Sequence, residues 1–477
     1  MVLSMAQGKI ISLCLLVACF FPKLTNLGAI TGIQEENSFK SSFLNNRIEI
    51  QIINLAKQYR IDTTLPWNKE KRRELDIIKQ TCEILDVYKA QTLEEGIEKF
   101  IKKTLFPIAN FAIVNARTTE FYGKSTGEVF FIKNAQGGLT YVVKAFPDAH
   151  TLQSHFLPEV SAIDMVRALQ LKKVIPIEQH GMAICLVGKE EWGLLLETAA
   201  PGVRLDQYLR DINKEDKESA KRQECLEIAL KAFKRVGTCL ACLHAKHASE
   251  TSTVPKNLLT KCEDKLALIL KNPFIVDKLS KHVDMDAFVK YVNEVKGNAQ
   301  LVKIHCNYIH GDTHMGNIFY DVSTDCCSFI DLGGLHRSID VRGEPISHAT
   351  MDLTQIEDSL GFYAGRLTEQ EMLAVREAFY SGYQEAGGEI PDIRLTDFYT
   401  LYFKLRRLVI KCNYRKETNS KIRDFDKSIF KEAVHYFQQR CPKSTVLQVH
   451  KNFNDLILKS IIKHFEVNTS VSSFCNV

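Results

Sequence analysis

The 477-residue chain has no internal repeats, no long low-complexity tract and no strong excess of either charge. Its formal net charge of +5 is too small to indicate binding to the phosphate backbone of DNA or RNA, so we expect no nucleic-acid partner. Hydrophobic residues make up 45% of the chain and charged residues 25%, which are the proportions of an ordinary globular protein. A chain of this length has room for about two to three compact units.

The chain also lacks a hydrophobic run long enough to cross a bilayer. Residues 10–21 form an uncharged run that follows Lys9 and ends at Pro22. This run has the length of a signal-peptide core, whereas a membrane-spanning helix needs about 20 apolar residues. We interpret residues 1–29 as a signal peptide, which predicts the secretory pathway or secretion, with no stable membrane span after its removal. Because the cleavage region is weak, residues 10–21 could instead be an uncleaved membrane anchor or a buried helix of a cytoplasmic protein.

The cysteines do not indicate a redox or haem centre. Removal of the first 29 residues leaves twelve cysteines, an even number that permits disulfides without requiring them. Cys239 and Cys242 have the spacing of a redox pair, but they close a predicted helix. A reactive dithiol needs the N-terminus of a helix to lower the pKa of its thiol. Core packing is therefore the better interpretation of this pair.

The hydrophobic pattern divides the chain into regions of different secondary structure. Spacings of three to four residues predict a helical extension over residues 30–110. Strands are then expected at 112–114, 128–132 and 140–144, followed by a helix and a further strand at 193–197. Beyond Pro201-Gly202 the pattern is mainly helical. We therefore expect an α+β fold, with a small strand-rich lobe at 111–200, a larger helical lobe at 201–477 and a cleft between the lobes.

The most informative stretch is His-Gly-Asp-Thr-His-Met-Gly-Asn at residues 310–317, followed by an Asp-Leu-Gly at 331–333. Phosphoryl transfer needs one carboxylate near the attacking hydroxyl and oxygen ligands for Mg²⁺ on the nucleotide phosphates. Kinase loops supply these groups from an Asp, an Asn five residues later and a second Asp after a short hairpin. Asp312, Asn317 and Asp331 have this spacing. The alternative interpretation is a polar turn between two core strands.

Residues before this loop could hold the phosphates of a nucleotide. Gly123, Ser125 and Gly127 belong to a glycine-containing turn between two expected strands, and Lys144 lies on the strand that follows. Glu159 is expected on the next helix, where it could orient Lys144 through an ion pair. Each of these signals is weak by itself. The assignment of these residues to a phosphate site depends on their order and spacing ahead of the 310–317 loop. A P-loop is excluded because Thr118 occupies the position of its first glycine, and a strand follows the turn where a helix is required.

Together these motifs resemble the aminoglycoside phosphotransferase/choline kinase group of the protein-kinase-like fold. That group has a His-Gly-Asp-x-His-x-x-Asn loop and an Ile-Asp metal motif, and both are present here within a resemblance that spans residues 111–383. It implies a bilobal fold that binds ATP and Mg²⁺, with Asp312 as the catalytic base and His310 as the residue that shapes the loop. Asn317 and Asp331 would be Mg²⁺ ligands, and Lys144 would contact the α- and β-phosphates.

The resemblance also implies a hinge at residues 197–202, where Glu197, Ala199 and their neighbours would meet the adenine through backbone groups. The chain departs from the group after the metal motif, because Asp331 is followed by Leu-Gly-Gly instead of an aromatic residue and Gly-Asp-Pro. This departure leaves the acceptor unidentified. Gly311 stands where protein kinases usually carry Arg, and no Ala-Pro-Glu follows the metal motif. Both features favour a small-molecule acceptor over a protein.

Two regions could contact the acceptor. Asp352, Glu357 and Asp358 could form an acidic wall for a cationic ligand. The basic run at 404–431, with ten Lys or Arg against three acidic residues, could instead bind an anion. Both could equally be solvated helix faces. The sequence thus predicts an ATP- and Mg²⁺-dependent kinase that transfers the γ-phosphoryl group to a small-molecule hydroxyl. A protein kinase and a catalytically weak binding module on a kinase fold are the alternatives.

Overall fold

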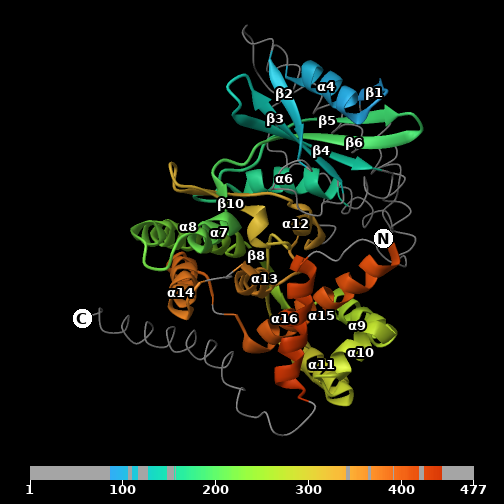
Figure 1. Ribbon diagram of the computed structural model, residues 1–477, viewed down its shortest axis with the longest axis vertical. Coiled ribbons are helices and arrows are strands. Elements are labelled where there is room, and N and C mark those ends of the chain that lie inside the picture. Colours follow the sequence, from blue (N-terminus) through green and yellow to red (C-terminus); the bar gives the residue numbers. More distant parts are fainter. Residues whose placement is uncertain are drawn as a thin grey trace, which may run out of the picture. The chain divides into compact units, whose positions relative to one another are not determined.

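The structure is a computed structural model that describes residues 86–105, 110–116, 127–147, 155, 157–339, 344–363, 367–389, 391–417 and 424–442 (Figure 1). The predicted signal peptide and most of the predicted helical extension lie outside these residues. Within them, no helix has both the length and the apolar character that a membrane span requires. The nine cysteines whose side chains the structure describes are free thiols, and Cys239 is fully buried, as core packing predicts.

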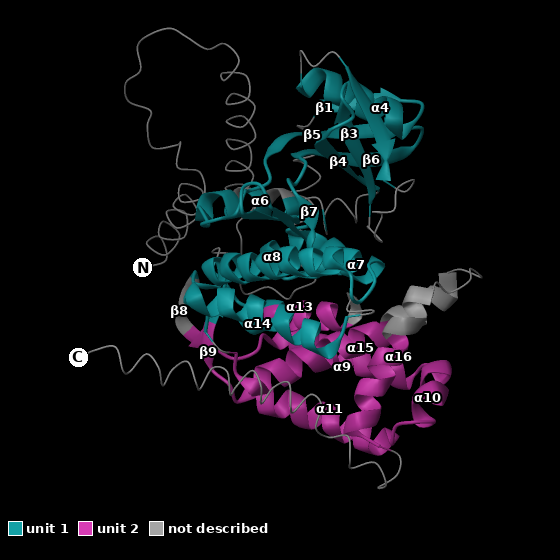
Figure 2. Cartoon of the chain, turned by 60° about the vertical axis from the view of Figure 1, so that its left-hand side comes forward, with its two compact units in different colours: residues 1–249, 306–352, 363–390 teal, residues 250–305, 353–362, 391–477 magenta. Residues whose placement is uncertain are grey.

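The chain divides into two compact units (Figure 2). Unit 1 comprises residues 1–249, 306–352 and 363–390, and unit 2 comprises residues 250–305, 353–362 and 391–477. The sequence predicts one helical lobe over 201–477, whereas the structure distributes this range between the two units. Every predicted catalytic, metal-binding and nucleotide-binding residue that the structure describes lies in unit 1.

Unit 1 contains a six-stranded sheet in the order β1-β5-β6-β4-β3-β2 (Figure 1). Its strands are β1 (Asp86–Ala90), β2 (Phe111–Asn115), β3 (Glu128–Asn134), β4 (Leu139–Pro147), β5 (Gln179–Val187) and β6 (Glu190–Thr198). Only β1 and β5 pair in parallel, and the other neighbours are antiparallel. The four strands expected from the sequence are present as β2, β3, β4 and β6, while β5 is an addition.

Residues 86–104 differ from the expected helical extension, because they form β1 and helix α4 (Leu93–Thr104) and pack with the sheet. Tyr88 of β1 faces the core, where its ring centroid lies 6.0 Å from that of Phe100 on α4. Thr92 ends the strand and begins the helix, since its side chain accepts a hydrogen bond from the Glu95 N–H. A continuous helix through this segment would lose the backbone hydrogen bonds to β5.

The rest of unit 1 is mainly helical. Its helices are α6 (Leu157–Leu169), α7 (Leu205–Lys214), α8 (Ala220–His244), α12 (Gly333–Arg337), the start of α13 (Ala349–Tyr363) and α14 (Glu369–Glu385). Strands β10 (Ile318–Asp321) and β11 (Cys326–Phe329) form the expected hairpin, which β7 (Val203–Arg204) extends to three strands. Strands β8 (His247–Ser252) and β9 (Ile304–Asn307) form a further pair. This arrangement of a sheet lobe and a helical lobe is the α+β plan that the sequence predicts.

Unit 2 is built from helices α9 (Lys256–Leu270), α10 (Pro273–Ser280), α11 (Met285–Gln300), α15 (Ile393–Glu417) and α16 (Asp424–Arg440). Its core includes an edge-to-face pair between Phe288 of α11 and Phe437 of α16, with ring centroids 4.8 Å apart. The start of the basic run lies in this unit. Lys404 is only 6% exposed, and it pairs with Asp358 at 2.7 Å and with Glu432. Arg407 pairs with the same two carboxylates, so this part of the run is neutralised inside the unit.

A buried ion pair joins two helices of unit 1. Arg222 at the start of α8 donates from Nε and Nη2 to the two carboxylate oxygens of Glu371, each at 2.8 Å. Glu371 also forms a capping box with Thr368 at the start of α14. The hydrogen bond from Arg222 outweighs desolvation and lowers the pKa of Glu371 from 4.5 to about 2. This pair therefore stabilises the folded state when the carboxyl is ionised.

We expect Glu371→Gln to reduce the free energy of unfolding by about 2–3 kcal/mol at pH 7, since one unit of pKa shift corresponds to about 1.4 kcal/mol. The folded-state pKa is depressed, so the contribution is present above pH 4.5 and is lost as the pH falls toward 2. Denaturant titrations of both proteins at several pH values measure this difference. Glu369→Gln, at an exposed position of the same helical turn, is the control and should change little. A difference that does not shrink in acid would contradict the assignment.

Candidate active site

The 310–317 loop passes close to the start of α12, and two glycines permit this. Gly311 has φ +76°, in the left-handed region that favours glycine. A Cβ on Gly311 would lie 2.8 Å from the backbone of Gly334, and one on Gly334 would lie 2.5 Å from the His310 carbonyl oxygen. A side chain at either position would push the loop away from the segment after Asp331. Gly311, where protein kinases usually carry Arg, is thus required by packing.

His310 links this loop to the strand that leads to Asp331. Its Nδ1 accepts a hydrogen bond from the Asp312 N–H at 3.3 Å, so Nε2 carries the proton and donates to the Ile330 carbonyl at 3.0 Å. The residue is 1% exposed, and its ring packs edge-to-face on Phe329. Both ring nitrogens are therefore occupied. His310, predicted within the catalytic set, has the contacts of a residue that shapes the loop.

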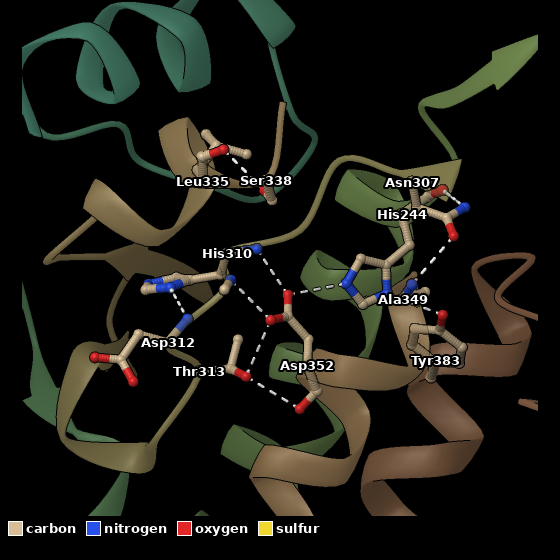
Figure 3. A network of polar contacts seen from close by, with 11 residues as sticks. His244, Asn307, His310, Asp312, Thr313, Leu335, Ser338, Ala349, Asp352 and Tyr383 are labelled. Carbon is tan, nitrogen blue, oxygen red and sulfur yellow. Dashed lines mark hydrogen bonds and ion pairs between the residues drawn. The ribbon is translucent and has the colours of Figure 1, made fainter. Parts of the chain in front are cut away.

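Asp352, at the start of α13, holds the loop from below (Figure 3). Its carboxylate accepts hydrogen bonds from the His310 N–H at 2.7 Å, the Gly311 N–H at 2.9 Å and the Thr313 hydroxyl at 3.2 Å. The side chain is fully buried. Desolvation opposes ionisation, but the hydrogen bond from His244 and its neighbours outweighs it, and the pKa of Asp352 is lowered. An ionised Asp352 therefore fixes the backbone on both sides of position 311.

Two further side chains complete this network. His244, the last residue of α8, has Nε2 3.1 Å from Asp352 and Nδ1 2.9 Å from the hydroxyl of Tyr383 on α14. Burial raises the pKa of Tyr383, so its hydroxyl stays protonated. Three helices thus meet at the carboxylate that holds the loop, while Figure 3 shows the Asp312 carboxylate directed away from them. The Asp312 carboxylate thus takes no part in the contacts drawn around Asp352.

Asn317 and Asp331 lie at the base of the same hairpin. The Ile330 N–H donates to the Asn317 carbonyl at 3.0 Å, which brings the residue after Ile330 beside the loop. The Asn317 side chain donates from Nδ2 to the Asp312 carbonyl at 3.0 Å, and this leaves its Oδ1 as an acceptor. Asp331 has φ +56°, an uncommon conformation for a residue with a side chain. The predicted spacing thus brings the two oxygen-bearing side chains to one place.

Lys144 lies among three carboxylates in unit 1. Its Nζ is 2.8 Å from Asp331, 2.9 Å from Glu159 of α6 and 3.3 Å from Glu197 of β6. Burial disfavours the ammonium form, but the three carboxylates outweigh it and raise the pKa of Lys144 well above its usual value. The same ion pair lowers the pKa of Asp331 against its desolvation. Lys144 is therefore a buried, permanent cation beside the loop.

Glu159 does more than pair with Lys144. Its Oε1 also accepts the Leu332 N–H at 3.0 Å, and its Oε2 accepts the Gly333 N–H at 3.0 Å. The backbone after Asp331 is thus bound to α6 and, through Glu159, to Lys144. The pairing of Lys144 and Glu159 that the sequence predicts is present, and Glu159 also binds the backbone directly after Asp331.

The remaining predicted nucleotide contacts have different surroundings. Gly123 and Ser125 lie outside the described residues. Gly127 is buried at the start of β3, where a Cβ would collide with the Ala145 carbonyl, so the sheet itself requires this glycine. The Ala199 N–H donates to the Thr140 carbonyl at 3.0 Å and is used within the sheet. Roles of these residues at a nucleotide stay predictions.

The acidic residues suggested for the acceptor have structural partners instead. Asp352 is enclosed by the network beneath the loop, and Asp358 is 8% exposed and paired with Lys404 and Arg407 in unit 2. His244 and Tyr383 were not predicted from the sequence. The only sign of them there is that each is a polar residue on an otherwise apolar helical face. The hinge role of Glu197 concerns its backbone and stays a prediction, while its side chain faces Lys144.

Within the described residues, unit 1 combines a six-stranded sheet with a mainly helical part, an α+β arrangement, and Lys144 of the sheet is ion-paired with Asp331 of the helical part. No family model matches the chain, and no curated protein sequence matches it. Among solved structures, the chain is similar to an amicoumacin kinase in complex with AMP-PNP and Ca²⁺, at 13% identity over 72% of this chain and 94% of that chain, with a TM-score of 0.45.

Two other solved structures show a comparable likeness. One is an aminoglycoside phosphotransferase from Streptomyces rimosus in complex with ADP and streptomycin, at 17% identity over 65% of this chain and 98% of that chain, with a TM-score of 0.40. The other is an ethanolamine kinase from Plasmodium vivax, at 13% identity over 78% of this chain and 96% of that chain, with a TM-score of 0.41. At these identities, the ligands named belong to those proteins and assign none to this chain.

Proposed function

We propose that this protein is an ATP- and Mg²⁺-dependent phosphotransferase that moves the γ-phosphoryl group of ATP to a hydroxyl group of a small molecule. One observation carries the proposal. His310 ties the backbone of Asp312 to Ile330, and the next residue, Asp331, is ion-paired with Lys144. The groups that phosphoryl transfer requires, a carboxylate for the acceptor hydroxyl and charged groups for the phosphates, are thus held on one connected framework.

The donor atoms near the loop fit a magnesium ion. Asp331 contributes carboxylate oxygens, and Asn317 contributes an amide oxygen whose NH₂ group is already engaged by Asp312. Mg²⁺ prefers oxygen ligands and is usually held by one or two protein side chains together with phosphate oxygens and water. When bound, the ion would neutralise charge that develops on the phosphates.

The roles of the protein groups follow from their positions. Lys144 would bind the α- and β-phosphates, with its orientation set by Glu159. Asp312 would accept the proton of the acceptor hydroxyl while the oxygen of that hydroxyl forms the new bond to the γ-phosphorus. The bond between this phosphorus and the bridging oxygen breaks at the same time, and ADP leaves. His310 and Asp352 would keep the loop in place during this step.

A small molecule is the favoured acceptor because of Gly311. Its close contact with Gly334 excludes any side chain at the position where protein kinases usually carry Arg. The absence of an Ala-Pro-Glu sequence after the metal motif agrees with this choice. Asp358, Lys404 and Arg407 are paired within unit 2, and Asp352 is buried under the loop, so these four charges do not identify the acceptor class.

Calorimetric titration with ATP in the presence and absence of Mg²⁺, followed by incubation with γ-labelled ATP, tests the proposal. We expect Mg²⁺-dependent ATP binding, and label that enters small molecules from a metabolite pool and is absent from proteins of an extract. Label in extract proteins would establish a protein kinase instead. ATP binding without any transfer, to either pool or to the chain itself, would favour the binding module.

We further propose that residues 1–29 direct the protein into the secretory pathway, on the basis of the uncharged run at 10–21. Fusion of residues 1–35 to a reporter protein tests this. Export and cleavage of the reporter are expected, and a reporter that stays in the cytoplasm would contradict the proposal. Retention at a membrane without cleavage would establish an anchor.

A further inference from the structure

Glu197 is a buried carboxyl group for which the proposed reaction has no stated use. In the register of β4 and β6, Glu197 lies opposite Val142, so Lys144 is its diagonal neighbour on the same face of the sheet. One oxygen, Oε2, lies 3.3 Å from Lys144 Nζ. The other, Oε1, is buried and has no hydrogen-bond partner. A buried acceptor without a partner costs about 1–3 kcal/mol, so this arrangement requires an explanation.

The three carboxylates around Lys144 are not equivalent. Glu159 and Glu197 have side chains only 8% and 4% exposed, and the first is fixed by two backbone N–H groups while the second is fixed in a strand. The side chain of Asp331 is 52% exposed, and the residue lies outside the helices and strands. Asp331 is therefore the partner that can turn away from Lys144, as it must if it becomes a metal ligand.

An ammonium group has three hydrogens to donate. Two acceptors fixed in the protein determine the direction of the third hydrogen, whereas one fixed acceptor leaves the group free to rotate about it. We propose that Glu197 is a positioning residue, which together with Glu159 holds Lys144 so that its third N–H passes from Asp331 to a phosphate oxygen when the metal–nucleotide binds. This inference rests on the proposed function, since it concerns the same nucleotide site.

The protonation of Glu197 is compatible with this role. Burial raises the pKa of Glu197 to about 8, and Lys144 acts in the opposite direction. A neutral carboxyl group still presents a carbonyl oxygen to the ammonium. Glutamine at this position should therefore replace Glu197 well, whereas leucine has a similar size and no acceptor. Glu197→Leu removes the unpartnered buried oxygen and also one of the three acceptors of Lys144, which keeps Glu159 and Asp331.

The test compares Glu197→Leu and Glu197→Gln with the wild type, with Glu191→Gln at an exposed position of the same strand as the control. The measurements are the Kd of ATP with Mg²⁺ by calorimetry, KM and kcat for ATP, and the melting temperature without nucleotide. We expect Glu197→Leu to weaken ATP binding and raise KM by about tenfold, the effect of one charge-assisted hydrogen bond. Its kcat should change less, because Lys144 contacts the phosphates before and during transfer.

The melting temperature of Glu197→Leu should stay close to that of the wild type, because loss of one Lys144 acceptor and loss of the unpartnered Glu197 oxygen act in opposite directions. Glu197→Gln should bind ATP within about threefold of the wild type. Weaker binding in a protein that is no less stable distinguishes positioning from a merely structural role. The inference is overturned if Glu197→Leu binds ATP like the wild type, or if it loses stability along with affinity while Glu197→Gln does not restore binding. If the wild type and Glu191→Gln bind no ATP, the proposed function fails, and this inference fails with it.

Discussion

Asp312→Asn should lower the rate of phosphoryl transfer by about a thousandfold or more while ATP binds as tightly as in the wild type. General-base catalysis contributes about 10²- to 10⁴-fold, and the amide cannot accept the proton of the acceptor hydroxyl. ATP binding should persist because Lys144 and Glu159 are independent of the Asp312 side chain. The loop should also persist, since His310 contacts the backbone N–H of Asp312 and Asn317 contacts its carbonyl.

This result is measured by single-turnover transfer from γ-labelled ATP and by calorimetric titration of ATP. Asp216→Asn, at an exposed position between α7 and α8, is the matched control and should keep full activity. Wild-type turnover in Asp312→Asn would reject Asp312 as the base. Loss of ATP binding together with turnover would instead mean that Asp312 belongs to the nucleotide site.

Asp352→Asn should have the second largest effect, on both stability and turnover. The carboxylate accepts hydrogen bonds from two backbone N–H groups and the Thr313 hydroxyl, and it contacts His244. The side-chain amide of the Asp352→Asn variant has only one acceptor oxygen, so its NH₂ group would face N–H donors that the wild-type carboxylate accepts. Disruption of a buried charged network typically costs about 3–5 kcal/mol. Because the pKa of Asp352 is lowered in the folded state, its contribution is present at neutral pH and is lost as the medium becomes strongly acidic.

Thr313→Val provides a milder variant in case Asp352→Asn does not fold. It removes one hydroxyl from the same network and should cost about 1–2 kcal/mol, with a smaller fall in kcat than Asp352→Asn. Denaturant titration and transfer kinetics measure the two effects. If both variants keep wild-type stability and kcat, Asp352 does not hold the loop. A loss of stability with unchanged kcat in Thr313→Val would restrict the network to a structural role.

Much of the geometry of the candidate site could be predicted from the sequence, because local spacing determines it. Asn317 follows Asp312 by five residues, and a short hairpin returns the chain to Asp331. Such contacts need little knowledge of the rest of the fold. The pairing of Lys144 with Glu159 was also predictable, since a strand followed by a helix brings residues fifteen apart together.

Contacts between distant segments could not be predicted in this way. Strand β5 was missed because its apolar run, broken by a register shift at residues 179–181, has no clear period of two. The end of the helical extension was misjudged since β1 acquires strand structure only through its parallel pairing with β5. Asp352 and Asp358 look like parts of a solvated face in sequence, and only the structure shows that their side chains are buried against partners far along the chain.

The sequence by itself determined the strands of the small lobe, the hairpin and the chemistry of residues 310–331, because these depend on periodicity and on short, rigid spacings. Only the tertiary structure decided which side chains support that chemistry. Asp352 fixes the loop because α8, α13 and α14 bring His244 and Tyr383 to it, and Glu197 faces Lys144 because of the register between β4 and β6. Burial and charge pairing arise from segments about forty to nearly two hundred residues apart, and no local pattern in the chain carries that information.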